Sequence, residues 1–172
     1  MIMDNQTNNG PVLTIVREFD APKKDVFNAF AEIEALNEWW GPAETENSAI
    51  SLDFRPGGVF HFKMESGGKV NYGRFLFSKI KPYDLLEFTN AFADENANTI
   101  RAPFDIQLPV EIFYSFAFAE SGGKTTLTMT GKPVNGTTEE EDTFVAINES
   151  MHQGFGGTFD QLEQYLTKLK AK

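Results

Sequence analysis

The sequence predicts an α+β fold in which a curved antiparallel β-sheet wraps around one long C-terminal helix. Apolar residues recur at every second position through most of residues 48–131, which is the period of β-strands. They recur at every third or fourth position over residues 144–169, which is the period of an amphipathic helix. Two shorter helical segments precede the alternating region and follow a first strand.

The first strand is predicted at residues 12–19, where Val12, Leu13, Ile15, Val16 and Phe19 supply the apolar positions. Before it, residues 1–10 are polar and rich in asparagine, so we expect a flexible N-terminal tail. A chain of 172 residues favours a single domain, here 11–172.

The two short helices are predicted at residues 26–33 and 34–39. Pro22 stands just before the first one, where its missing N–H does least harm. Gly41 and Pro42 end the second, because glycine accepts a left-handed cap and proline cannot continue a helix.

The sheet region is divided by turn signals. Arg55-Pro56-Gly57-Gly58 has the proline and glycine positions of a type II turn. The string ESGGK occurs at residues 65–69 and again at 120–124, and each copy is predicted to form a hairpin turn. The strands predicted between these signals are 50–54, 60–64, 72–80, 85–92, 110–119 and 125–130.

Residues 94–107 fit no strand and are long for a hairpin connection. Long loops in compact domains are often lids or binding loops, and the alternative is an insertion without a role.

The final element is predicted as one amphipathic helix of about 30 residues, roughly 45 Å long. A capping box fits Thr138 and Glu141 at its start. Gly154, Gly156 and Gly157 lie inside it, where each glycine costs about 1 kcal/mol relative to alanine. Either the helix bends or packs closely there, or the glycines leave room beneath it. This helix is the one element long enough to cover the apolar face of the sheet.

Phenylalanine is unusually frequent, with 17 residues against 2 tryptophans and 4 tyrosines. Its ring has no polar atom, so this composition favours either a phenylalanine-rich core or an apolar cavity. A curved sheet that grips a long helix leaves an elongated space between the two.

Composition also excludes several classes of protein. The absence of cysteine excludes disulfides, cysteine-ligated metals and thiol nucleophiles. A net charge of −10 argues against binding nucleic acid or an anionic membrane. No apolar run is long enough to span a bilayer, and no secretory leader is recognised at the N-terminus. We therefore expect a cytoplasmic protein.

This order of elements, together with several motifs, resembles the START-like (SRPBCC) superfamily with the helix-grip fold. More narrowly it resembles the branch named after the activator of heat-shock-protein-90 ATPase. The resemblance covers residues 14–169. The motifs that carry it are Phe19-Asp20-Ala21-Pro22, Trp39-Trp40-Gly41-Pro42, Asp53-Phe54-Arg55-Pro56-Gly57-Gly58, Pro82-Tyr83-Asp84-Leu85-Leu86-Glu87-Phe88-Thr89, Gly123-Lys124-Thr125-Thr126-Leu127 and Gly154-Phe155 with Phe159 and Leu162.

The chain departs from the branch in two places. Phe155 stands where the family often has tryptophan, and the 94–107 loop is longer than usual. Both differences affect the shape of the cavity that the resemblance implies. Members of the superfamily bind lipids, sterols and polyketides, act as cyclases or hydrolases, or regulate chaperones, so function has to be argued from the site.

The candidate ligand-binding residues are those expected on the inner face of the sheet, on the second short helix, on the long loop and on the final helix. They are Trp40, Phe60, Phe62, Phe77, Leu86, Phe88, Arg101, Phe104, Tyr114, Phe116, Met151, His152, Phe155 and Phe159.

No catalytic residue, metal site or cofactor is predicted, because no recognised catalytic, metal-ligand or phosphate-loop spacing is present. His61 alternates with Phe60 and Phe62 and is expected to face away from the cavity. Asp53 and Arg55 share a strand face and are expected to form an ion pair, with carboxylate capture by Arg55 or Arg101 as the alternative.

Three functions are compatible with these observations. The first is binding of a small hydrophobic or amphipathic ligand between the sheet and the C-terminal helix. The second is a protein-interaction module that regulates a chaperone. The third is a small hydrolase or cyclase acting in the same cavity. A homodimer through an exposed edge strand is a further possibility.

Overall fold

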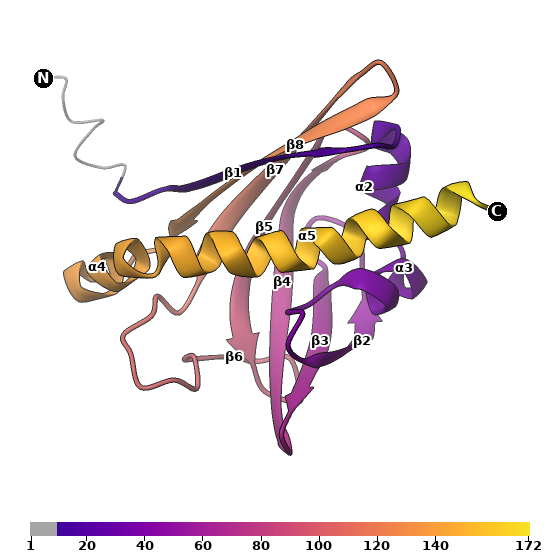
Figure 1. Ribbon diagram of the computed structural model, residues 1–172. Helices are drawn as coiled ribbons and strands as arrows, with labels where there is room; N and C mark the ends of the chain where they lie inside the picture. Colours follow the sequence, from indigo (N-terminus) through magenta and orange to yellow (C-terminus); the bar gives the residue numbers. More distant parts are fainter. Residues whose placement is uncertain (1–9) are drawn as a thin grey trace, which may run out of the picture.

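The computed structural model describes residues 10–172, so the predicted N-terminal tail lies outside the described residues except for Gly10. Figure 1 shows a curved sheet with a long helix, α5, lying across its inner side. The strands are β1 (Leu13–Phe19), β2 (Glu46–Leu52), β3 (Val59–Ser66), β4 (Lys69–Lys81), β5 (Leu85–Ala93), β6 (Thr99–Ile100), β7 (Ile112–Ser121) and β8 (Lys124–Pro133). The helices are α2 (Lys23–Ala31), α3 (Ile33–Trp39), α4 (Thr138–Ala146) and α5 (Asn148–Lys170).

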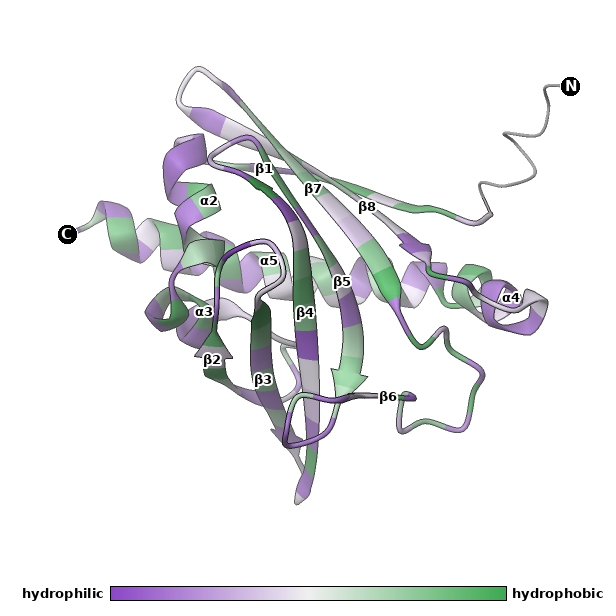
Figure 2. Ribbon diagram, turned by 180° about the vertical axis from the view of Figure 1, so that it is seen from behind, coloured by the Kyte–Doolittle hydropathy of each residue, from purple (hydrophilic) through white to green (hydrophobic). Residues whose placement is uncertain are grey.

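All strands pair antiparallel in the order β1-β8-β7-β5-β4-β3-β2, and the short β6 pairs with β5. Helices α2 and α3 come between β1 and β2, which are the two ends of this order. The predicted fold class is therefore confirmed: a curved antiparallel sheet around a long C-terminal helix, with two short helices after the first strand. Figure 2 shows hydropathy alternating along β3 and β4, as expected where one face of a sheet covers a core.

The predicted turns are also present. The amide of Gly58 donates to the carbonyl of Arg55 at 2.8 Å, and Gly57 has a φ of 87°, as a type II turn requires. The two ESGGK strings form the β3–β4 and β7–β8 hairpins, and both glycines of each string have positive φ.

The C-terminal region differs from the prediction of one uninterrupted helix. It is divided into α4 and α5 at Ile147, whose backbone has φ −98° and ψ 9°. Hydrogen bonds run across the break, from the Ile147 amide to Thr143 and from the Met151 amide to Ile147. The apolar period continues through the break, and for this reason the sequence does not reveal it.

The capping box is real but begins one residue earlier than predicted. The Thr137 side chain accepts from the Glu140 amide at 3.1 Å, and the Glu140 carboxylate accepts from the Thr137 amide at 3.0 Å. Adjacent threonines and three consecutive glutamates make the two registers indistinguishable in sequence. The three glycines of α5 do not interrupt the helix.

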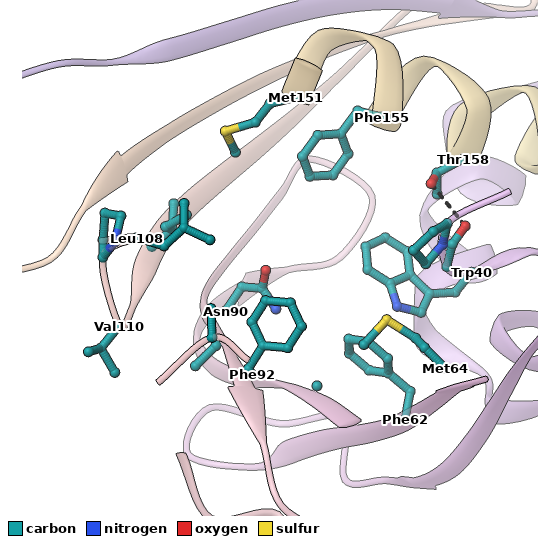
Figure 3. A pocket seen from close by; sticks show the side chains of 18 residues that line it. Trp40, Phe62, Met64, Asn90, Phe92, Leu108, Val110, Met151, Phe155 and Thr158 are labelled. Atoms are coloured by element: carbon teal, nitrogen blue, oxygen red, sulfur yellow. Dashed lines mark hydrogen bonds between the residues drawn. The ribbon is translucent and has the colours of Figure 1, made fainter. Parts of the chain in front are cut away.

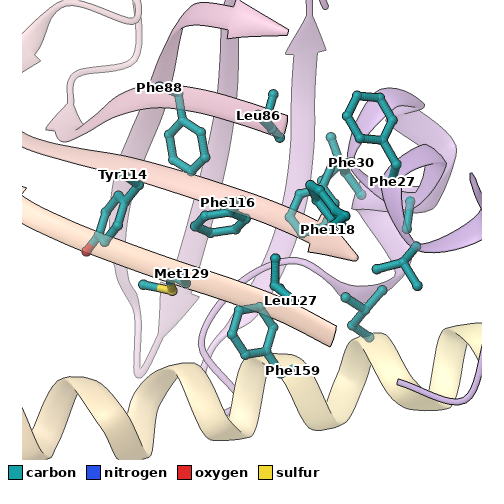
Figure 4. Close-up of a cluster of buried hydrophobic side chains, with 14 of the residues drawn as sticks. Phe27, Phe30, Leu86, Phe88, Tyr114, Phe116, Phe118, Leu127, Met129 and Phe159 are labelled. Atoms are coloured by element: carbon teal, nitrogen blue, oxygen red, sulfur yellow. The ribbon is translucent and has the colours of Figure 1, made fainter. Parts of the chain in front are cut away.

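Between the sheet and α5 lies a core built largely from phenylalanine (Figure 4). Phe75 and Phe88 stack with ring centroids 4.0 Å apart, and Phe116 meets both Phe88 and Phe159 edge-on. Each fully buried phenylalanine contributes about 1.5–3 kcal/mol relative to an exposed one. Most of the inner sheet face is therefore packed core.

Candidate functional site

One part of the interior is not filled by side chains. A cavity of about 250 Å³ lies under the first half of α5, above β3, β4 and β5. Residues 40–42, which follow α3, and the loop between β6 and β7 complete its wall (Figure 3). The lining residues are Trp40, Gly41, Pro42, Phe62, Met64, Gly73, Asn90, Ala91, Phe92, Ala102, Leu108, Pro109, Val110, Ile112, Met151, Gly154, Phe155 and Thr158.

Helix α5 contributes one face to the cavity. Met151, Gly154, Phe155 and Thr158 are spaced by three and four residues, so they lie along one side of the helix. A Cβ atom built at Gly154 would meet no atom within 4 Å, which shows open space at this position. Gly154 lines the cavity and is itself exposed to solvent, so the cavity is open to the outside beside this residue.

Helix α5 also fixes the position of Trp40. The Thr158 hydroxyl donates to the carbonyl of Gly41 at 2.9 Å, shown as a dashed line in Figure 3. The Gln161 side-chain amide donates to the carbonyls of Trp39 and Gly41 at 3.0 and 2.9 Å. These three hydrogen bonds hold the backbone on both sides of Trp40 against the helix. They therefore also fix the position from which the indole ring extends.

The two tryptophans have different environments. Trp39 is 1% exposed, and its indole nitrogen donates to the carbonyl of Ala29 at 2.9 Å. The Trp40 ring lies edge-on to Phe62 and Phe75, with centroids 5.6 and 4.9 Å away. Its indole nitrogen is buried, yet no acceptor for it exists among residues 10–172.

Asn90 is the polar residue in a strand of inward-facing apolar side chains. It follows Leu86 and Phe88 and precedes Phe92 at every second position of β5. Its side-chain amide donates one hydrogen bond to the carbonyl of Arg74 at 3.0 Å. Figure 3 shows its oxygen directed toward the space below α5.

The predicted loop covers one side of the cavity. Its residue Ala102 belongs to the wall, together with Leu108, Pro109 and Val110, which follow the loop. Arg101 holds this loop: its guanidinium donates to the carbonyl of Leu108 at 3.2 Å and to the Glu140 carboxylate at 2.8 Å. The long loop is therefore part of the site and is tied to the start of α4.

Four of the fourteen candidate residues line the cavity together: Trp40, Phe62, Met151 and Phe155. Seven others lie in the packed core, where each is at most 2% exposed: Phe60, Phe77, Leu86, Phe88, Tyr114, Phe116 and Phe159. Some of these rings touch the wall from behind: Phe60 meets Phe62 with centroids 5.0 Å apart, and Tyr114 and Phe159 meet Phe155 at 5.7 and 5.8 Å.

The three remaining candidates lie outside the cavity. Arg101 is in the ion pair with Glu140 described above. Phe104 is 52% exposed and packs edge-on against Phe92, which does line the cavity. His152 is exposed on α5, one residue beyond Met151.

Sequence reasoning missed several lining residues. Met64, Asn90 and Ile112 continue the alternation of strand residues that were selected, so the period contains a signal for them. Ala102, Leu108, Pro109 and Val110 have no such period, because they lie in irregular structure.

Electrostatically, the cavity is neutral. Among the described residues, none that lines it has an acidic or basic side chain. Burial raises the pKa of the Tyr114 hydroxyl in the adjoining core.

The predicted ion pair of Asp53 and Arg55 is confirmed at 2.8 Å. His61 faces away from the cavity as expected and is only 4% exposed, with its Nε2 3.0 Å from the carbonyl of Asp94.

Over residues 10–172, histidine and acidic side chains nowhere gather in a group of three or more that could hold a metal ion. None of the helices described combines the length and apolar character needed to cross a bilayer.

A curved antiparallel sheet that grips a long C-terminal helix, with a cavity between them, defines the START-like helix-grip class. Within that class, residues 20–167 match the family described as Activator of Hsp90 ATPase homolog 1-like protein, and the chain belongs to this family. The resemblance stated from the motifs is thereby confirmed. No curated protein shows significant sequence similarity to the chain.

Solved structures of bacterial proteins have the same fold. A protein from Arthrobacter aurescens is 26% identical, with a TM-score of 0.74 over 91% of this chain and 86% of that chain. A protein from Mycobacterium smegmatis is 24% identical, with a TM-score of 0.72 and 90% of each chain covered. One from Staphylococcus epidermidis is 21% identical, with a TM-score of 0.75 over 94% of this chain and 92% of that chain.

Proposed function

We propose that this protein binds a small hydrophobic molecule in the cavity between the sheet and α5. The observation that carries this proposal is the cavity itself, about 250 Å³ bounded mainly by apolar side chains and lying beside a core that is otherwise closely packed. A cavity of about 150 Å³ lined by apolar residues holds benzene in another protein. The space here therefore suits a molecule of one or two rings, or a short branched chain.

Apolar burial would supply the affinity. Each Å² of apolar ligand surface removed from water contributes about 25 cal/mol, so about 250 Å² gives roughly 6 kcal/mol before the costs of association. Three features support a pre-formed site: the rigid sheet floor, the helix above it and the fixed position of Trp40.

The direct test is a titration of ¹⁵N-labelled protein with a neutral bicyclic hydrocarbon, 2-isopropenylnaphthalene, followed by amide chemical shifts. We expect saturable shifts centred on the lining residues, such as Phe62, Phe92 and Phe155. Amides far from the cavity, such as Gly122 in the β7–β8 hairpin turn, should move little. Shifts that do not saturate, or that spread over the surface without reaching the lining residues, would refute the proposal.

A second candidate function is docking onto a chaperone, which the family description suggests. The observation that favours it is the exposure of two large apolar side chains on one loop, Phe104 at 52% and Ile106 at 47%. The test is the ATPase rate of a heat-shock-protein-90 chaperone with and without this protein. A change in rate that the Phe104→Ser and Ile106→Ser double variant abolishes would support docking, and an unchanged rate would count against it.

We do not extend the proposal to catalysis. Hydrolysis or cyclisation needs an acid or base within reach of the substrate. The lining residues described above supply an amide, a hydroxyl and an indole N–H, but no acidic or basic side chain.

A further inference from the structure

The polar groups of the cavity define which hydrophobic molecules it would prefer. Three polar side chains line it: Trp40, Asn90 and Thr158. The Thr158 hydroxyl already donates its hydrogen to Gly41, and the Asn90 amide already donates one hydrogen to Arg74. The Trp40 N–H is the donor that is buried without an acceptor among residues 10–172.

We propose that the cavity selects uncharged molecules that have one hydrogen-bond acceptor, such as a carbonyl or ether oxygen, and that this acceptor meets the indole N–H of Trp40. This inference rests on the proposed function and specifies its ligand class. An indole nitrogen can only donate, so it is satisfied by an acceptor and by nothing else. A buried donor without a partner is unfavourable, and a ligand that supplies the acceptor removes that cost.

The neutral wall accounts for the requirement that the ligand be uncharged. An ionised carboxylate or amine in this space would leave water without meeting an opposite charge, because no acidic or basic side chain lines the cavity in the described part of the chain. Burying an unpaired charge is far more costly than burying a carbonyl group. The single N–H of Trp40 does not compensate for that cost.

The Trp40 indole nitrogen has no exposed surface, so a ligand in the cavity reaches it only when a neighbouring side chain moves aside. Met64 lines the cavity together with Trp40, and its thioether overlaps the indole in the view of Figure 3. Methionine is unbranched and adapts its rotamer easily, so an acceptor can reach the indole nitrogen when this side chain shifts. The ring of Trp40 itself is held by its contacts with Phe62 and Phe75 and by the hydrogen bonds that fix its backbone.

The two tryptophans make the test internally controlled. The protein has 2 tryptophans, so a ¹H–¹⁵N spectrum contains two indole N–H signals. Trp39 already donates to Ala29, so its signal is a reference that a ligand acceptor should leave in place. A Trp40→Phe variant assigns the second signal and removes the donor while keeping an aromatic ring.

Three probes of similar shape separate the effect of the hydrogen-bond acceptor from the effect of charge. The first, 2-acetonaphthone, is a neutral acceptor. The second, 2-isopropenylnaphthalene, has a CH₂ group in place of the ketone oxygen, and the third, 2-naphthoate, is charged. We expect the ketone to move the Trp40 signal downfield, and the hydrocarbon not to do so. The ketone should bind about tenfold more tightly than the hydrocarbon, which corresponds to about 1.4 kcal/mol. This advantage should disappear in Trp40→Phe, and the carboxylate should bind at least about tenfold more weakly than the ketone.

The outcomes distinguish the two levels of the proposal. If hydrocarbon and ketone bind equally and the Trp40 signal does not respond to the ketone, the inference is wrong while the binding function stands. A carboxylate that binds as tightly as the ketone also overturns it. If neither neutral probe binds, the proposed function fails, and this inference fails with it. The wild-type spectra decide between these results even if Trp40→Phe does not fold.

Discussion

The aromatic ring of Phe62 lies directly over Gly73, its cross-strand partner on β4. A Cβ atom at position 73 would overlap the Phe62 ring, so glycine is what allows the ring to lie against the strand. Both residues line the cavity. The same relationship joins Tyr114 on β7 to Gly131 on β8, outside the cavity wall.

Gly73→Ala is expected to destabilise the protein by about 1–3 kcal/mol, because overpacking forces the Phe62 ring off its position. It should also change the cavity floor and weaken binding of 2-isopropenylnaphthalene. The measurements are chemical denaturation and a binding titration. Gly131→Ala is the matched control, since it meets Tyr114 in the same way while neither of these two residues lines the cavity.

The two variants should therefore agree in stability and differ in binding. Equal effects on binding would show that the Phe62–Gly73 contact has no special part in the cavity.

The Arg101–Glu140 ion pair is expected to hold the loop that covers the cavity. The amide of Thr137 and the guanidinium of Arg101 hold the pKa of Glu140 below its usual value of 4.5. The stabilisation from this lowered pKa is complete above about pH 4.5 and is lost as the pH falls through the lowered value. Protection against hydrogen exchange, taken relative to the intrinsic rate at each pH, should therefore fall at the start of α4 and in the 101–108 loop as the pH is lowered below this value.

A Glu140→Gln variant isolates the charge, because glutamine can keep the capping box. We expect a loss of about 0.5 kcal/mol at neutral pH, since Arg101 is half exposed. Exchange in the loop should lose the pH dependence that Glu140 supplies. Glu139→Gln removes the same charge from the same helical turn, and should have no such effect on the loop. An equal effect of the two variants would assign the change to the helix dipole.

The buried hydroxyl of Tyr114 is expected to make stability fall at high pH. Burial raises its pKa above the usual 10.0, so the unfolded chain loses this proton first as the pH rises. Its contribution is complete below about pH 10 and decreases above it. In Tyr114→Phe, urea denaturation should show a shallower loss of stability above this pH. Tyr165, whose pKa is also raised, should supply part of the slope that is left. An identical slope in wild type and variant would contradict this account.

The order of strands and helices follows from the sequence because one-sided strands and an amphipathic helix have strong periods. The division between cavity and core does not follow from the same signal. Phe60 and Phe62 share a strand face, yet only Phe62 reaches the cavity. Which residue does so depends on where the curved sheet separates from α5, and the strand period carries no information about that point. Leu108 and Val110 lie in an irregular loop, whose path depends on contacts such as the one from Arg101 to Leu108.

The most direct test of the binding function compares two glycines of α5. Gly154 lines the cavity and Gly156 does not, and a Cβ at either position would meet no atom within 4 Å. Leucine should stabilise the helix by up to about 1 kcal/mol at both positions. At Gly154 it should also occupy the space over the cavity.

The decisive measurement is the dissociation constant of 2-isopropenylnaphthalene for wild type, Gly154→Leu and Gly156→Leu. The account predicts that Gly156→Leu binds like the wild type, and that Gly154→Leu binds at least about tenfold more weakly, or about 1.4 kcal/mol. Equal binding by the two variants would contradict the claim that the ligand lies between α5 and the sheet.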